Sequence, residues 1–284
     1  MRRWLLVLLY AATFAALAWL AWRGREYYAL PLVERPHHPL HWELKPGGSV
    51  ARWYGIAGAA LMTAMLVYSL RKRAAWLRRA GHLGAWLDFH IWCGITGPLL
   101  IVLHSALKVG GLIAISFWSM VAVALSGIVG RFLYAQIPRT AAGDQLSLED
   151  ARRLDAELSE RLRSEFDLSE SELASLDPAG GTRAAGGSVA GALSALAVEP
   201  LRLRRRLARF RARHARLPHD VLARLTALAG QRALLHRRLA LWRSLHELFH
   251  YWHVFHKPFA VLMYLFAALH IGVAWVTGYA LGGA

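Results

Sequence analysis

Five long runs without a charged residue constrain this chain more than any other feature of its sequence. Each run is between 18 and 27 residues long. At a rise of about 1.5 Å per residue, a helix of about 20 residues crosses the roughly 30 Å hydrocarbon core of a bilayer. We therefore predict five transmembrane helices, at residues 4–22, 53–70, 89–107, 109–130 and 258–284.

The composition supports a membrane protein and excludes several classes of function. Hydrophobic residues make up 56% of the chain, which is too apolar for an ordinary soluble domain of this length. The net charge of +16 comes with no nucleic-acid-binding motif, so we expect no nucleic-acid partner and assign the excess to membrane-flanking loops. The single cysteine, Cys93, excludes an internal disulfide and four-cysteine iron–sulfur or zinc sites. Because no Cys-x-x-Cys-His motif is present, any haem would be bound non-covalently.

The distribution of basic residues predicts the orientation of the chain in a bacterial inner membrane. Arginines and lysines concentrate in 71–79 and in the long segment between the last two spans, and such loops stay in the cytoplasm. The amino terminus is then cytoplasmic and the carboxyl terminus periplasmic. The basic residues of the outer loop, 23–52, weaken this assignment. The first run also resembles a signal peptide, but we interpret it as a retained helix.

The segment between the last two spans is amphipathic, and we predict a helical cytoplasmic insertion there. Ser147-Leu-Glu-Asp150 is typical of a capping box that opens a helix through about Phe166, and Ser169-Glu-Ser-Glu172 of a second cap. Residues 177–191 are typical of a linker, and 202–216 of an arginine-rich helix that lies near anionic lipid or packs on a partner subunit. The expected organisation is a transmembrane helix (1–22), an outer loop (23–52), transmembrane helices two to four (53–137), the insertion (138–241) and a fifth transmembrane helix (242–284).

Four histidines in two predicted spans carry the functional hypothesis. His90 and His104 belong to the third span, and His256 and His270 to the fifth, with fourteen residues between the members of each pair. Fourteen residues turn a helix by about 1400°, within about 40° of four full turns, and rise about 21 Å. Each pair therefore lies on one helix face, with a histidine near each membrane surface. Because both spans run in the same direction, His90 pairs by depth with His256, and His104 with His270.

This set of histidines indicates the axial ligands of two stacked b-type haems, both bis-histidine. Neutral imidazole is a good ligand for haem iron, and filling both axial positions favours electron transfer. The alternative is that the histidines form hydrogen bonds or relay protons inside the membrane. Nearby cations could pair with haem propionates or lie at the interface, and nearby glycines could admit a flat ring or serve helix packing. The cations are Lys108, Arg131 and Lys257, and the glycines are Gly94, Gly97, Gly127 and Gly130.

Two further groups of histidines each have more than one possible role. One group, at i, i+4 and i+7 just before the fifth span, could take a proton, bind quinone, ligate a metal or pack against headgroups. The other, in the outer loop, could bind a metal or a redox partner, or lie in a solvated loop. The groups are His246, His250 and His253, and His37, His38 and His41.

The paired histidines on two parallel spans resemble the dihaem transmembrane domain of ferric reductases and NADPH oxidases. More distantly, they resemble the dihaem cytochrome b subunits of quinone-linked respiratory complexes. The resemblance covers residues 86–134 and 246–279, and it implies that these histidines hold two haems that form a path for electrons across the membrane. The oxidase-type families also carry a flavin- and nicotinamide-binding module. We expect none in this chain, because it contains neither Gly-x-Gly-x-x-Gly nor Gly-Lys-Ser/Thr.

The sequence as a whole predicts an all-α membrane protein with a four-helix haem-binding bundle. The expected function is an electron-transfer subunit of a membrane oxidoreductase complex, working between the quinone pool or a cytoplasmic donor and a periplasmic redox protein. That partner would be a cytochrome or an iron–sulfur protein, and membrane lipid would surround the bundle. The alternatives are a quinol-linked or ferric-type reductase acting at the outer haem, and a non-redox transporter or scaffold with proton-relay histidines.

Overall fold

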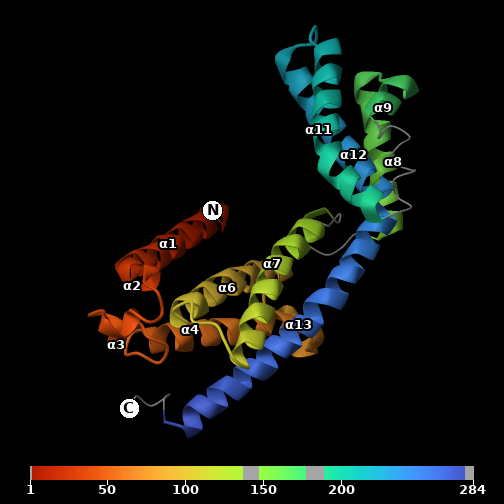
Figure 1. The fold of residues 1–284 in the computed structure, drawn as a ribbon. Coiled ribbons are helices and arrows are strands. Elements are labelled where there is room, and N and C mark those ends of the chain that lie inside the picture. Colours follow the sequence, from red (N-terminus) through yellow and green to blue (C-terminus); the bar gives the residue numbers. More distant parts are fainter. Residues whose placement is uncertain (1, 137–146, 177–188, 279–284) are drawn as a thin grey trace. The chain divides into compact units, whose positions relative to one another are not determined.

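The structure, a computed structural model, describes residues 2–136, 147–176 and 189–278, and these residues form helices and no strand (Figure 1). The chain divides into two compact units. The first, called the membrane unit here, comprises Met1–Ile128 and Val254–Ala284. The second, called the insertion unit, comprises Val129–His253.

Five helical segments in the described part of the chain are long and apolar enough to cross a membrane, as the sequence predicts. Each is assigned from its length and composition. The segments are α1 (Arg2–Arg23), α4 with α5 (Ala51–Ala64 and Val67–Arg73), α6 (Leu83–His104), α7 (Ile113–Gln136) and α13 (Trp242–Val276). Short elements join them: α2 (Arg25–Ala29), η1 (Arg35–His37), α3 (His41–Leu44) and η2 (Ala75–Arg79).

The boundaries of the spans differ from the uncharged runs because helices extend past charged residues. The third span begins at Leu83, six residues before its run, and ends at His104. Beyond it, Ala106 and Leu107 have positive φ angles of 47° and 59°, which stop a right-handed helix. The fourth helix continues through Arg131 to Gln136, so Arg131 does not end it.

Glycines bring α4 and α6 into close antiparallel contact. A β-carbon on Gly58 would lie 3.0 Å from the carbonyl oxygen of Gly97, and one on Gly97 would lie 2.8 Å from the Cγ of Met62. Both distances are shorter than an ordinary van der Waals contact, so only glycine allows this approach of the two backbones. In a membrane, lipid is as apolar as the side chains, so helices associate mainly through close van der Waals packing. Small residues make that packing possible.

A layer of three methionines joins α4, α7 and α13 in the membrane unit. Met62 of α4, Met120 of α7 and Met263 of α13 are buried together. Two side-chain hydrogen bonds hold α13 in place: Ser116 donates to the carbonyl oxygen of Met263 at 2.9 Å, and Tyr264 donates to that of Met62. These bonds fix α13 beside both α4 and α7.

In the residues that the structure describes, the helices of the insertion unit pack around an apolar core of their own (Figure 1). The helices are α8 (Leu148–Phe166), α9 (Glu170–Leu176), α11 (Val189–Arg213) and α12 (His219–Ala240). Leu162, Leu173, Phe210 and Leu225 contribute one buried side chain from each helix. The apolar faces of these helices are therefore buried against one another within the unit.

Both predicted N-caps are present in the insertion unit, and the second forms a full capping box. Ser147 accepts a hydrogen bond from the backbone N–H of Asp150 at 3.0 Å, and α8 ends at Phe166 as expected. Ser169 and Glu172 satisfy each other's backbone N–H groups at 3.3 and 2.9 Å. The predicted linker, 177–191, lies mostly outside the described residues, which resume at Val189.

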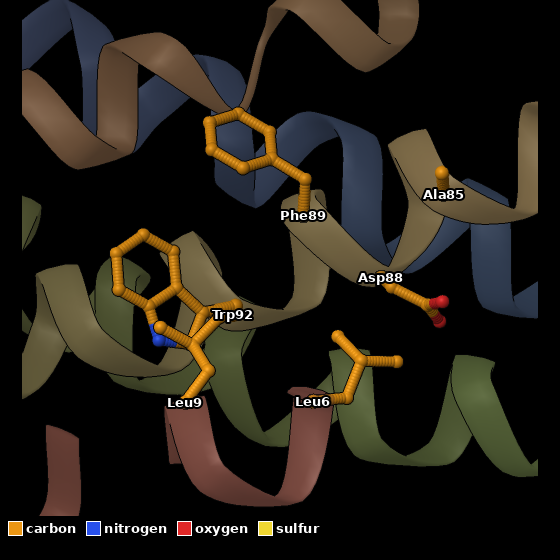
Figure 2. A pocket seen from close by; sticks show the side chains of 6 residues that line it. All are labelled: Leu6, Leu9, Ala85, Asp88, Phe89 and Trp92. Atoms are coloured by element: carbon orange, nitrogen blue, oxygen red, sulfur yellow. The ribbon is translucent and has the colours of Figure 1, made fainter. Parts of the chain in front are cut away.

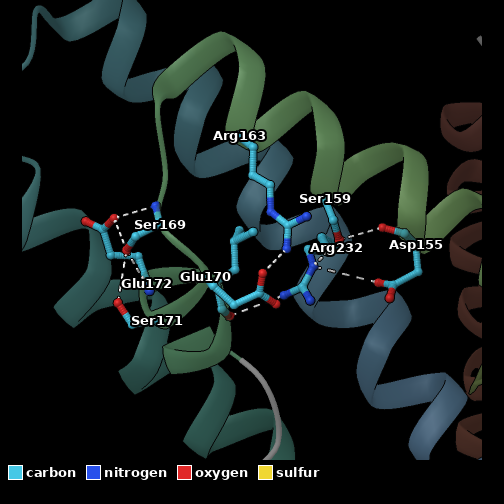
Figure 3. A network of polar contacts seen from close by, with 9 residues as sticks. Asp155, Ser159, Arg163, Ser169, Glu170, Ser171, Glu172 and Arg232 are labelled. Atoms are coloured by element: carbon cyan, nitrogen blue, oxygen red, sulfur yellow. Dashed lines mark hydrogen bonds and ion pairs between the residues drawn. The ribbon is translucent and has the colours of Figure 1, made fainter.

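A buried arginine joins the helices of the insertion unit (Figure 3). Arg232 of α12 donates to the hydroxyl of Ser159 at 2.8 Å and to the carbonyl oxygen of Leu173 at 3.2 Å. It also lies 3.9 Å from the carboxylate of Asp155. One side chain thus connects α12 to both α8 and α9.

Candidate functional site: the histidines of the membrane unit

His104 is the last residue of α6, and its ring lies against the first turn of α4. Its Nδ1 is 2.9 Å from the carbonyl oxygen of Ala51. A carbonyl oxygen only accepts, so Nδ1 must carry the proton, and in the neutral ring the lone pair is on Nε2. Gly55 makes room for this geometry, because a β-carbon there would lie 2.7 Å from Nδ1 of His104.

His90 is oriented in the same way at the other end of α6. Its Nδ1 is 3.0 Å from the carbonyl oxygen of Met65, so this ring also presents Nε2 as its basic nitrogen. Met65 lies where the helix of the second span is interrupted, between Ala64 and Val67. The Met65 carbonyl oxygen also accepts from the backbone N–H of Tyr68 at 3.3 Å, and its second lone pair serves His90. Tyr68 flanks the ring, with 5.2 Å between ring centroids.

His256 reaches the same tautomer through a serine. Its Nδ1 is 2.7 Å from the hydroxyl oxygen of Ser126, and that hydroxyl lies 2.9 Å from the carbonyl oxygen of Val123. The hydroxyl has one hydrogen, which it donates to the carbonyl, so it must accept from Nδ1 of His256. The lone pair of the imidazole is then on Nε2, as in His90 and His104.

His270 lies on an exposed face of α13 and close to His104. The two rings are near enough to interact electrostatically. On the second span, His104 lies at Ala51 and His90 at Met65, so Met62 is near the His90 end. Tyr264 of α13 contacts Met62, and it lies between His270 and His256 in the sequence. The helices α6 and α13 therefore run in the same direction, as predicted, with His90 and His256 toward one end and His104 and His270 at the other. The methionine layer lies between the two ends.

A flat macrocycle needs open space beside its histidine ligands, and the glycines on these faces show where such space exists. A β-carbon on Gly127, the neighbour of Ser126, would meet no protein atom within 4 Å, and one on Gly94 only the sulfur of Met65 at 3.7 Å. Both positions leave space beside a histidine. Gly97 instead packs on Met62, and Gly130 packs on Trp252, so these two glycines serve helix packing. The histidines and the open glycine faces are compatible with haem.

The three candidate propionate partners are all solvent- or lipid-accessible. Lys108 follows the end of α6 by four residues, and Lys257 follows His256 directly. Arg131 belongs to the insertion unit. The side chains of all three are exposed, so each is available to an acidic group of a ligand or a lipid.

The other histidine groups do not assemble into a metal site in the part of the chain that the structure describes. No three side chains of the histidine, cysteine or carboxylate type converge there. His246 and His253 each have Nδ1 at 2.9 Å from a carbonyl oxygen of their own helix. In the loop before α4, His41 lies 3.3 Å from the hydroxyl of Tyr27, and His38 accepts from the backbone of Leu40. The bonds of His246 and His253 stay within α13, whereas those of His90 and His104 reach from α6 to the second span.

Three contributions to the site are missed by sequence reasoning. Ser126 and Gly55 are not close to a histidine in sequence, and the Met65 carbonyl depends on the interruption of a helix. A small-residue pattern at Gly55 and Gly58 is the one available signal, and it predicts close helix packing without naming the partner. No protein-family model, curated protein or solved structure matches this chain, so its function must be argued from these contacts.

Proposed function

We propose that the chain is a dihaem b-type membrane cytochrome that conducts electrons between the two faces of a bacterial inner membrane. His90 and His256 would hold one haem on the cytoplasmic side, and His104 and His270 would hold the other on the periplasmic side. The observation that carries the proposal is the common orientation of three imidazoles, each with Nδ1 donating a hydrogen bond and Nε2 basic.

This orientation is what metal coordination requires. Histidines that bind metals usually donate the proton of the other ring nitrogen to a carbonyl or similar acceptor, which fixes the tautomer and the ring plane. A proton relay has no such requirement, because it needs both ring nitrogens to exchange protons. Three rings held in one tautomer by three different acceptors therefore favour ligation over a relay.

Bis-histidine ligation also selects among redox functions. A haem with both axial positions filled by the protein has no open site for oxygen or a substrate, and it supplies one-electron transfer when bound. The chain itself would bind the rings, hold them in register and keep water from them. Substrate chemistry would take place on a partner subunit, a periplasmic cytochrome or iron–sulfur protein, or at a quinone site.

The insertion unit is the surface that we assign to such a partner. Arginines on α11 are exposed at several consecutive turns, while the apolar side of the helix is buried in the core of the unit. Arginine is enriched in protein interfaces because its guanidinium forms two hydrogen bonds with a carboxylate. The exposed arginines are Arg202, Arg204, Arg205, Arg209, Arg211 and Arg213.

The pairing of histidines is tested by variants that lose one haem each. His104→Ala and His270→Ala should each leave about one haem per chain with the same midpoint potential, and His90→Ala and His256→Ala should leave the other. His246→Ala is the matched control, because that ring is bonded to its own helix, and it should retain both haems. If His104→Ala and His256→Ala leave haems with the same potential, and His270→Ala leaves the other haem, the pairing is wrong.

A reductase that acts at the periplasmic haem is the second candidate. It is favoured by the exposure of His270, which would place that haem near the surface of the bundle. Reoxidation of the reduced protein by a soluble ferric chelate would support this function. Reoxidation by a periplasmic cytochrome alone would support the electron-conducting subunit.

A further inference from the structure

A pocket between α1 and α6 lies outside the histidine site. Its volume is about 150 Å³, and it opens on the surface of the membrane unit (Figure 2). Leu6 and Leu9 of α1 form one wall, and four residues of α6 form the other. The residues of α6 are Ala85, Asp88, Phe89 and Trp92, which share one face of that helix because they are three or four positions apart.

The carboxylate of Asp88 distinguishes this pocket from an ordinary gap between helices. Asp88 is the one acidic residue of the sequence within 53–128 and 254–284, and the pocket that it lines is otherwise apolar. A carboxylate at such a position is costly, and ionisable groups in membrane helices tend to mark ligand or proton sites. Figure 2 shows the carboxylate beside the side chain of Leu6.

The wall of the pocket is fixed by a hydrogen bond between the two helices. The indole N–H of Trp92 donates to the hydroxyl of Thr13 at 3.1 Å, and that hydroxyl donates to the carbonyl oxygen of Leu9 at 2.8 Å. Because the indole N–H is used, the ring of Trp92 offers its apolar surface to the pocket. Phe89 lies 6.3 Å from it, centroid to centroid.

These features define the chemistry of a ligand. A pocket of about 150 Å³ with an apolar lining holds one six-membered ring, and because the pocket is open a second fused ring can extend out of it. Aromatic walls favour a flat ring, and a carboxylate repels phosphate headgroups and favours a neutral ligand with a hydroxyl that can donate. Because the pocket lies between two helices assigned as membrane spans and is open, it favours a lipid-soluble molecule. A hydroquinone head group meets all of these conditions.

We propose that this pocket binds the head group of a membrane quinol, with a quinol hydroxyl donating to Asp88. The proposal rests on the proposed electron-transfer function, because a quinol would supply the electrons that the haems conduct. Asp88 and His90 are two residues apart on α6 but face different sides of it. The bound ring and the His90 imidazole would be separated by about one helix diameter, roughly 10 Å.

The binding site is tested on the full-length protein in phosphatidylcholine nanodiscs with a photoreactive azidoquinone and menadiol as competitor. Labelled peptides should map to residues 6–13 and 85–92, and menadiol should prevent the labelling. Asp88→Asn keeps the shape of the side chain and removes its charge, so it should raise the menadiol concentration needed for half protection at least about tenfold. Ala85→Trp should fill the pocket and abolish the labelling.

Matched variants separate the site from general effects. Glu34→Gln removes an exposed acid of a loop, and Ala11→Trp adds an indole to the exposed face of α1. Both should label and compete as the wild type does. Labelling that is unchanged by Asp88→Asn and Ala85→Trp overturns the proposal. Protection by phosphatidylglycerol but not by menadiol also overturns it and identifies the pocket as a lipid site.

Haem content, measured on the same nanodiscs, keeps this result distinct from the proposed function. The labelling does not require haem. Two haems per chain without menadiol-sensitive labelling would overturn the quinol site alone. Menadiol-sensitive labelling without haem would overturn the proposed function and leave the pocket as a quinol-binding site.

Discussion

The ring of His104 lies over the α-carbon of Gly55, so closely that a β-carbon on Gly55 would be 2.7 Å from the Nδ1 of His104. The same nitrogen is bonded to the carbonyl oxygen of Ala51, one turn earlier on α4. The first turn of α4 therefore determines where this imidazole lies. Such support is typical of metal-binding histidines, whose hydrogen-bond partners are as important as the ligands.

Gly55→Ala should displace the His104 ring and lower the haem content from about two per chain to about one. The added methyl group cannot be accommodated without movement of the ring, because a contact of 2.7 Å is well inside van der Waals distance. Gly110→Ala is the control, since a β-carbon there meets no atom within 4 Å. Two haems in both variants would show that His104 does not need this position.

Ser126→Ala should weaken the haem held by His256 and leave the other haem in place. The variant removes the acceptor of the Nδ1 proton, and loss of such a partner typically lowers metal affinity about 10- to 100-fold. Titration of the apoprotein with haemin measures the effect. Ser126→Thr keeps the hydroxyl and should restore most of the affinity. Equal affinities for serine, alanine and threonine would exclude a role for the hydroxyl.

Arg35→Ala should destabilise the loop that precedes α4 and expose the end of α6. The buried guanidinium of Arg35 donates to the carbonyl oxygens of Leu30, Tyr28 and Ala106, and Ala106 lies two residues after His104. Leaving these acceptors without a donor should lower the free energy of unfolding by on the order of 3 kcal/mol. Thermal unfolding of the purified protein measures the loss.

Arg35→Lys should rescue little of this stability, because an ammonium group lacks the planar fork that reaches three acceptors. Arg25→Lys, at an exposed ion pair with Glu26, is the control and should change stability by less than about 0.5 kcal/mol. A lysine at position 35 that matches the wild type would contradict the assigned role of the guanidinium.

The stability of the insertion unit should fall in acid through Glu172. Hydrogen bonds from the hydroxyl and the backbone N–H of Ser169, together with the nearby His214, hold the pKa of Glu172 below its ordinary value of 4.5. A carboxyl group with a depressed pKa stabilises the fold fully above its unfolded pKa, and the contribution is lost as the pH falls through the folded value. Unfolding temperatures measured from pH 6 to pH 3 should show this loss.

Ser169→Ala should reduce that dependence on pH and cost about 1 kcal/mol at neutral pH, the usual value of a helix cap. Ser175→Ala removes a hydroxyl that is bonded only within its own turn and serves as the control. An undiminished loss of stability in acid for Ser169→Ala would assign the acid sensitivity to other carboxylates.

Much of the helical architecture could be predicted from the sequence, because it depends on local patterns. The five spans follow from the length of uncharged runs, and both N-caps follow from residues three positions apart. The helix α8 ends at Phe166, about where it was predicted to end. Periodicity also placed the histidines of each pair on one face.

The remaining features depend on contacts between distant segments. The interruption at Met65 has no proline or glycine to mark it, and its carbonyl acquires a role only because His90 of α6 lies beside it. Ser126 and His256 are 130 positions apart. The helix at 202–216 was predicted to lie near anionic lipid or to pack on a partner subunit. The apolar residues of the insertion also form a core of their own, which the amphipathic pattern alone does not distinguish.

The central claim is tested most directly by the ratio of haem to protein in the purified full-length chain. A pyridine haemochrome assay should give about two haems per chain, with an α-band of the b type in the reduced-minus-oxidised spectrum. A ratio near zero after expression with ample haem supply would contradict the account, because the oriented imidazoles of His90, His104 and His256 would then serve some other function.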